Sequence, residues 1–148
     1  MTYDAIISEL RALTIEDFQY NDTDVDGLTR LRQLTDELRR LPAPERAIPE
    51  LFAVIERLPE SDLGTPGPLV HTLESLSGYE SELVASIRRF PASLSVWMLN
   101  RILNLSLSPD KRAKYLDLLR DVMDHPTAPE TAKDDAELFL EHQEDRIA

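Results

Sequence analysis

The sequence predicts an all-α protein of about eight helices, and three observations lead to this prediction. Apolar residues recur every three or four positions through most of the 148 residues, which is the spacing of one face of a helix. No convincing stretch alternates apolar and polar residues as a half-buried strand would. Prolines and glycines interrupt the apolar pattern at intervals that suit the ends of helices.

The first two helices are expected at residues 3–13 and 26–41. Their predicted apolar faces consist of Ile6, Ile7, Leu10 and Leu13 in the first, and Leu28, Leu31, Leu34, Leu38 and Leu41 in the second. Pro42 and Pro44 end the second helix, because proline lacks the N–H that a helix interior requires.

The third helix is expected to begin within residues 44–51, because Pro44 suits a first helical turn. Its predicted inward residues are Leu51, Phe52, Ile55 and Leu58. The following segment, ESDLGTPGP at 60–68, contains two glycines and two prolines and is predicted to be a turn. The apolar pattern of a fourth helix (Leu69, Val70, Leu73, Leu76) resumes directly after it, and Gly78 ends that helix.

Four further helices are expected in the second half of the chain. The fifth covers 79–90, before Pro91, and the sixth covers 93–105 and is apolar on nearly every side, as a helix between neighbours would be. Ser108 is a predicted N-cap, which starts the seventh helix. The eighth carries four residues that we predict to face inward: Ala136, Leu138, Phe139 and His142.

A pattern of apolar residues followed by proline occurs three times. LFAVIERLP ends at Pro59, LVASIRRFP ends at Pro91, and YLDLLRDVMDHP ends at Pro126, so the prolines lie 32 and 35 positions apart. This is the length of a helix–turn–helix repeat. We therefore expect one domain, 1–148, in which 1–44 form N-terminal capping helices and 45–142 form three HEAT-like, stacked helical hairpins of an α-solenoid. The alternative is an irregular helical bundle.

The composition is strongly acidic, with 28 acidic against 16 basic residues and a net charge of −12. Residues 15–26 hold five acidic residues and no basic one, and residues 128–148 hold seven against two. Such a surface repels nucleic acid and anionic membranes and attracts basic partners. The start, MTYDAIISEL, does not resemble a signal peptide, and no apolar run approaches the roughly 18 residues of a membrane span, so we expect a cytoplasmic protein.

The segment DTDVDG at 22–27 matches the first positions of an EF-hand calcium loop through Asp22, Asp24 and Asp26. The match then fails, because the position of the bidentate glutamate is occupied by Gln33. The favoured interpretation is an acidic helix N-terminus, with Asp24 or Asp26 as the cap. We also include the three aspartates among the candidate partner-binding residues.

Catalytic and metal-binding motifs are missing from the sequence. The chain has no cysteine, no G-x-S-x-G segment and no P-loop. His71 with Glu74, and Asp121 with His125, are helical pairs that supply two metal ligands at most. We therefore expect no enzymatic activity, no cofactor and no metal.

Several polar residues on the expected fourth and sixth helices are candidates for partner binding. Asn100 and Asn104 lie one turn apart in an otherwise apolar helix, so they either form hydrogen bonds across the core or face a groove. If the hairpins stack, the second helix of each hairpin lines one face. The predicted binding residues on that face are His71, Glu74, Trp97, Asn100 and Asn104.

Residues 48–104 resemble the bacterial immunity proteins of polymorphic-toxin and contact-dependent inhibition systems. The segments that carry the resemblance are DLGTPGPLVHTLE at 62–74 and VWMLNRILN at 96–104. The resemblance implies a small, mostly helical cytoplasmic protein that binds and neutralises a cognate toxin domain, such as a nuclease. It implies no particular binding residues, because each immunity protein follows its own toxin. The alternative is a helical-repeat adaptor or scaffold that binds another basic protein.

Overall fold

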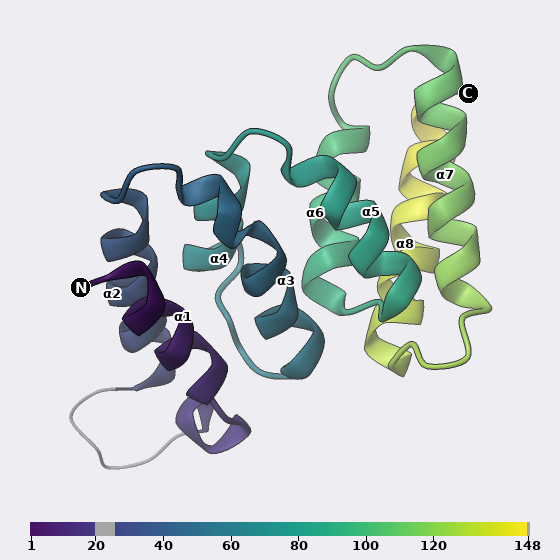
Figure 1. Cartoon of the computed structure of the whole chain (residues 1–148). Helices are drawn as coiled ribbons and strands as arrows, with labels where there is room; N and C mark the ends of the chain where they lie inside the picture. Colours follow the sequence, from purple (N-terminus) through teal and green to yellow (C-terminus); the bar gives the residue numbers. More distant parts are fainter. Residues whose placement is uncertain (20–25, 148) are drawn as a thin grey trace. The chain divides into compact units, whose positions relative to one another are not determined.

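The computed structural model describes residues 1–19 and 26–147, and every regular element in these ranges is helical (Figure 1). The α-helices are α1 (Tyr3–Ala12), α2 (Gly27–Arg39), α3 (Ile48–Arg57), α4 (Gly67–Glu74), α5 (Tyr79–Arg89), α6 (Ser93–Leu103), α7 (Pro109–Met123) and α8 (Glu130–Ile147). Two short 3₁₀-helices, η1 (Ile15–Phe18) and η2 (Pro44–Ala47), precede α2 and α3. The predicted all-α class with eight helices is confirmed.

Prolines and capping side chains set the helix ends as the sequence indicates. α3, α5 and α7 end two or three residues before Pro59, Pro91 and Pro126. At the start of α7, the Ser108 hydroxyl accepts a hydrogen bond from the Lys111 backbone N–H at 3.3 Å. These ends are local effects, because a proline or a cap acts within one helical turn.

The chain forms two compact units, Met1–Glu82 and Leu83–Ala148. In the first, α1 packs against α2 and α3, and α4 packs against α2 and α3. Leu10, Leu34, Phe52 and Leu69 come from these four helices and are completely or almost completely buried. The predicted N-terminal capping helices α1 and α2 therefore contribute directly to the core of this unit.

Ion pairs join the helices of the first unit at its surface. Arg11 on α1 pairs with both carboxylate oxygens of Glu50 on α3, and Glu9 on α1 pairs with Arg30 on α2. The hydrogen bond from Arg11 lowers the pKa of Glu50 below its ordinary value. Two parallel hydrogen bonds fix the orientation of an arginine and a carboxylate more strongly than a single contact does.

In the second unit, a buried polar group joins three helices. α6, α7 and α8 pack against one another, and Gln143 of α8 is completely buried between them. Its amide nitrogen donates to Asn100 Oδ1 and Asn104 Oδ1, both at 2.8 Å. Arg112 of α7 donates to the Gln143 side-chain oxygen at 3.1 Å and to the Leu103 carbonyl at 3.0 Å.

The inward face predicted for α8 is wrong at two of its four positions. Leu138 is 60% exposed and His142 is also exposed. The buried residues are instead Ala132, Ala136 and Gln143, which lie on one face at helical spacing. Small alanines allow α8 to approach α6 and α7 closely, and the hydrogen bonds of Gln143 compensate for its burial.

The stacked-hairpin arrangement stays a prediction.

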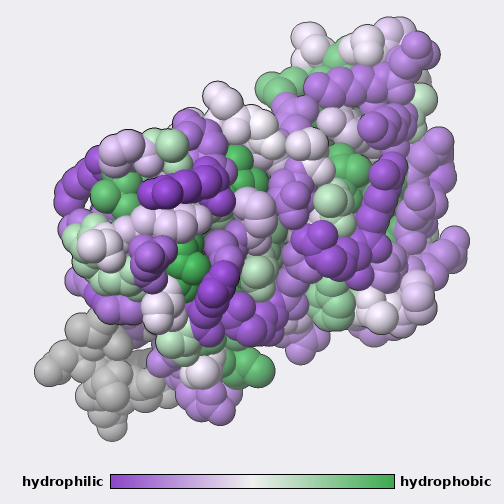
Figure 2. All heavy atoms as spheres, viewed as in Figure 1, coloured by the Kyte–Doolittle hydropathy of each residue, from purple (hydrophilic) through white to green (hydrophobic). Residues whose placement is uncertain are grey.

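Within the described part of the chain, none of the helices combines the length and the apolar composition that crossing a membrane would require. Hydrophilic residues cover most of the visible face of each unit, with smaller apolar patches between them (Figure 2).

Candidate functional site

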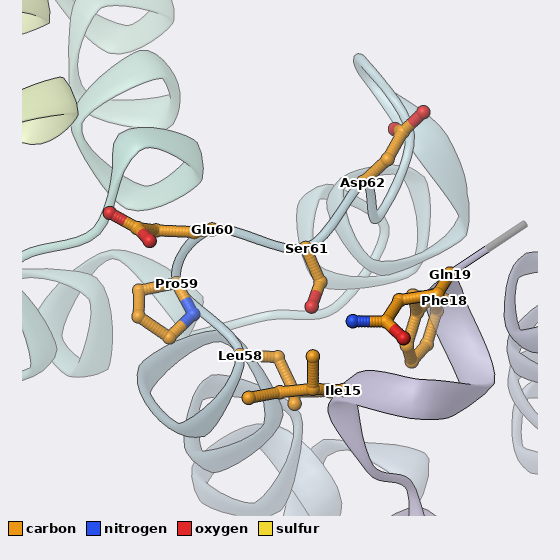
Figure 3. A pocket seen from close by; sticks show the side chains of 8 residues that line it. All are labelled: Ile15, Phe18, Gln19, Leu58, Pro59, Glu60, Ser61 and Asp62. Carbon is orange, nitrogen blue, oxygen red and sulfur yellow. The ribbon is translucent and has the colours of Figure 1, made fainter.

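The first unit contains a pocket of about 390 Å³ between η1 and the segment that follows α3 (Figure 3). It is lined by Ile15, Phe18, Gln19, Leu58, Pro59, Glu60, Ser61 and Asp62. Figure 3 shows Ile15 and Leu58 close together on one side, with Ser61 and Gln19 pointing toward each other across the space. We call this the η1 pocket.

Short-range interactions fix the η1 wall of this pocket. The Asp17 carboxylate accepts hydrogen bonds from the Thr14 backbone N–H at 2.8 Å and from its hydroxyl at 3.1 Å. Gly27, the first residue of α2, lies directly behind this turn. A Cβ on Gly27 would lie 2.5 Å from the Asp17 carbonyl oxygen and 2.9 Å from Phe18 Cδ1. Glycine therefore permits the close approach of α2 to η1.

The η1 pocket combines apolar walls with an acidic margin. Ile15 is 54% exposed, so a branched apolar side chain is presented to solvent. Glu60 and Asp62 direct their carboxylates away from the centre of the pocket (Figure 3). Glu16 and Asp17 add two more exposed acidic residues next to Ile15. The pocket can therefore accept an apolar side chain from a partner whose neighbouring residues are basic.

Asp26 has the capping role that the sequence suggested. Its carboxylate accepts a hydrogen bond from the Thr29 backbone N–H at 2.7 Å at the start of α2, and this bond lowers the pKa of Asp26. Asp22 and Asp24 lie outside the described residues. No group of three His, Asp or Glu side chains gathers as metal ligands in the parts of the chain that are described.

The other predicted binding residues have different environments. His71 is exposed on α4 and lines a second pocket between α2 and α4, and Glu74 lies half-buried one turn later. On α6, Trp97 is half-buried, with the Arg101 guanidinium carbon 5.0 Å from the centre of its ring.

Asn100 and Asn104 have an internal structural role. Both accept hydrogen bonds from Gln143, and Asn104 accepts another from Arg146 at 2.6 Å. The sequence left open whether Asn100 and Asn104 form hydrogen bonds across the core or face a groove, and the structure shows that they form hydrogen bonds within the second unit. Neither side-chain oxygen is left without a donor.

Sequence analysis did not identify the η1 pocket, although one signal for it was present. Ile15 and Phe18 are apolar residues three positions apart in a segment that is otherwise acidic. That spacing places both on one side of a short helical turn. Their proximity to Leu58, more than 40 positions later, depends on the packing of η1 against α2 and is not a local property.

Comparisons with protein-family models, with curated protein sequences and with solved structures found no match to this chain.

Proposed function

We propose that this protein is an immunity-type inhibitor, which binds a bacterial toxin domain in the cytoplasm and neutralises it by protein–protein contact without catalysis. The observation that carries the proposal is the η1 pocket, where an exposed apolar wall is bordered by carboxylates. The resemblance of residues 48–104 to immunity proteins supports the same function.

The chemistry of the η1 pocket defines the kind of partner surface that would fit it. Ile15 would contact an aliphatic or aromatic anchor, with the half-buried Phe18 also in the pocket wall, and such an anchor provides most of the affinity in a typical interface. Glu16, Glu60 and Asp62 would face lysines or arginines around that anchor. A nuclease domain is such a partner, because a protein that binds nucleic acid presents a basic surface.

Net charge supports this proposal through the rate of association. A chain of net charge −12 attracts a basic partner over a distance of about 8–10 Å at physiological salt. The rate of complex formation should therefore fall as salt rises. A complex anchored by apolar residues should dissociate at a rate that salt changes much less.

The direct test is co-expression with the protein encoded immediately upstream of this gene, where the proposal predicts a toxin domain. The wild-type chain should restore growth and co-purify with that domain. The Ile15→Asp variant should weaken binding at least tenfold, because it places a charge against the apolar anchor. Leu138→Asp is the matched control, since Leu138 is similarly exposed but lies on α8, and it should bind like the wild type.

A second pair of variants tests the acidic margin. Glu60→Lys should slow association with the toxin domain, and Glu137→Lys, at an exposed position on α8, serves as the control for the same change in net charge. If the chain fails to protect cells from the toxin, the immunity function is excluded. If it protects cells but Ile15→Asp binds normally, the η1 pocket is not the interface. A helical-repeat adaptor would bind a basic protein without conferring protection.

A further inference from the structure

A second pocket in the first unit has the opposite charge character from the η1 pocket. It measures about 280 Å³ and lies between α2 and α4. Its lining consists of Arg32, Thr35, Asp36 and Arg39 from α2, and Gly67, Pro68, His71 and Thr72 from α4. Two arginines and a histidine thus surround one small space in a protein with a large excess of acidic residues. We call this the α2–α4 pocket.

A buried hydroxyl in the wall of this pocket lacks a hydrogen-bond partner. Thr72 is only 1% exposed, and its Oγ1 has no partner in the structure. Thr35 in the same wall is equally buried, but its hydroxyl donates to the Leu31 carbonyl at 3.0 Å. Buried hydroxyls normally find a partner, so this unpartnered hydroxyl is an unusual feature of the pocket wall.

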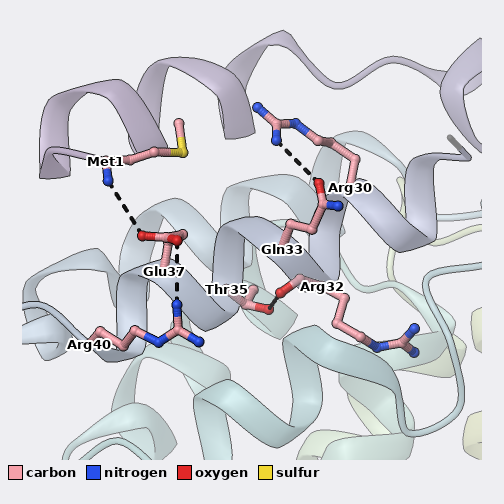
Figure 4. A network of polar contacts seen from close by, with 7 residues as sticks. All are labelled: Met1, Arg30, Arg32, Gln33, Thr35, Glu37 and Arg40. Atoms are coloured by element: carbon pink, nitrogen blue, oxygen red, sulfur yellow. Dashed lines mark hydrogen bonds and ion pairs between the residues drawn. The ribbon is translucent and has the colours of Figure 1, made fainter.

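The two arginines of the α2–α4 pocket differ from two neighbouring arginines. Arg30 on α2 pairs with Glu9, and Arg40, the C-cap of α2, pairs with Glu37. Arg32 and Arg39 have no carboxylate within ion-pair distance among the described residues, although the charge of Arg32 helps to lower the pKa of Asp26. In Figure 4 the Arg32 side chain extends away from Glu37 and Arg40. The dashed line at Arg32 marks the hydrogen bond that the Thr35 hydroxyl donates to the backbone carbonyl of Arg32.

The start of α4 adds a further feature that favours an anion. Pro66 occupies the N-cap position and provides no side-chain hydrogen bond to the first turn. A Cβ added to Gly67 would meet no atom within 4 Å, so the space beside the first turn is open. Pro68 supplies no backbone N–H, but those of Gly67 and Leu69 in the same turn attract negative charge because no side-chain cap satisfies them.

We propose that the α2–α4 pocket binds a small phosphate-class oxyanion. Arg32 and Arg39 would donate charge-assisted hydrogen bonds to its oxygens, and His71 and the Thr72 hydroxyl would donate from α4. A pocket of about 280 Å³ has room for inorganic phosphate or a small phosphomonoester. This inference does not depend on the proposed inhibitory function.

Asp36 gives the site a means of selecting among anions. It lies on α2 between the two arginines and is exposed, so it presents an acceptor to the same pocket. Hydrogen phosphate carries an O–H that can donate to this carboxylate, whereas sulfate at neutral pH carries none. Phosphate should therefore bind more tightly than sulfate. Asp36→Asn should remove this preference and strengthen sulfate binding.

The test is isothermal titration of the full-length chain with inorganic phosphate, sulfate and chloride at constant ionic strength. Wild-type protein should bind phosphate with a defined stoichiometry of one. The double variant Arg32→Gln/Arg39→Gln should lose at least tenfold in affinity, because each arginine provides charge-assisted hydrogen bonds. Arg40→Gln, on the same helix, should bind phosphate like the wild type.

Thr72→Val separates binding from folding. Replacing the unpartnered hydroxyl by a methyl group should leave the melting temperature of the free protein unchanged or raised, yet weaken phosphate binding about two- to tenfold. Thr29→Val is the control, because Thr29 lies on α2 outside the lining of this pocket, and it should leave phosphate affinity unchanged. The melting temperature in phosphate provides a second measurement, because a bound ligand should raise it in the wild type. The double arginine variant serves as the control, since any rise that it shows is the general effect of this salt on stability.

Three outcomes would overturn the proposal. These are the absence of phosphate binding by the wild-type chain, equal binding by the double arginine variant, and equal losses of affinity in Thr72→Val and Thr29→Val. Titration with glycerol phosphate distinguishes a phosphomonoester ligand from free inorganic phosphate. If glycerol phosphate binds more tightly than inorganic phosphate, the ligand is a phosphomonoester, and if it binds more weakly, the ligand is the free ion.

Discussion

Replacing Gln143 by leucine should strongly destabilise the second unit. The side chain is completely buried, and its amide donates two hydrogen bonds and accepts one from Arg112 at 3.1 Å and a longer one from Arg146 at 3.4 Å. The two neutral bonds contribute about 1 kcal/mol each and the bond to a charged group about 1.5–3 kcal/mol. Leucine has a similar size but can form none of them, so we expect the free energy of unfolding to fall by about 3–5 kcal/mol.

The orientation of the Gln143 amide makes a sharper comparison possible. Arginine only donates hydrogen bonds, so Arg112 requires the Gln143 oxygen on its side and leaves the nitrogen for Asn100 and Asn104. In Gln143→Glu, the Asn100 amide can rotate to present its N–H₂ group, Asn104 Oδ1 keeps its hydrogen bond from Arg146, and the new charge faces Arg112. Gln143→Glu should therefore destabilise the unit less than Gln143→Leu.

Trp97 provides an assay that reports on the second unit. It is the single tryptophan of the chain and lies on α6, the helix that carries both asparagines. Urea unfolding followed by its fluorescence should show the midpoint of Gln143→Leu at least about 1 M lower, given slopes of roughly 1–3 kcal/mol per molar. The reasoning would be refuted if the midpoint of Gln143→Leu lay within about 0.2 M of the wild-type midpoint. It would also be refuted if Gln143→Glu lowered the midpoint more than Gln143→Leu does.

Two further predictions concern the first unit. Gly27→Ala should lower stability by about 1–3 kcal/mol, because its Cβ would lie 2.5 Å from the Asp17 carbonyl oxygen, and a thermal melt checks this. The pKa of Glu50 is lowered from its ordinary value of 4.5 by Arg11, so the unfolded chain binds the proton more tightly. The stabilising effect of this pair is present above pH 4.5 and is lost as pH falls through the folded pKa, so Glu50→Gln should flatten the acid limb of a pH-dependent melt.

Helix positions were predictable because the signals that set them are local. Ser108 followed by proline marked the start of α7, and Pro91 marked the end of α5 within two residues. A cap or a proline acts on its own helical turn whatever the rest of the fold does. The same reasoning predicted Asp24 or Asp26 as a cap of α2, and Asp26 has this role.

The burial of individual side chains on α8 was less predictable. Apolar periodicity favoured Leu138 for the core, yet the structure exposes it and buries Gln143. A glutamine is stable in a core only where donors and acceptors surround it, and here they come from α6 and α7. Their positions relative to α8 depend on packing between residues that are 31 to 43 positions apart in the sequence.

The candidate sites were missed for the same reason. The η1 pocket joins Ile15 to Leu58, and the α2–α4 pocket joins Arg32 to Thr72. Each pair comes from separate helical segments whose adjacency no short motif encodes. Sequence analysis did select His71, but as part of a different predicted surface. Its proximity to two unpaired arginines follows only from the packing of α2 against α4.

The two pockets of the first unit can be tested separately because their expected salt responses differ. Binding of a basic partner at the η1 pocket is driven by the acidic surface and by an apolar anchor, so phosphate and chloride should slow association equally at constant ionic strength. Binding at the α2–α4 pocket requires particular donors and should distinguish the two anions. If phosphate alone changed the affinity for the toxin domain, and Arg32→Gln/Arg39→Gln removed that effect, the two sites would be energetically coupled. By linkage, the toxin domain would then change phosphate affinity by the same factor, which a titration of the complex can measure.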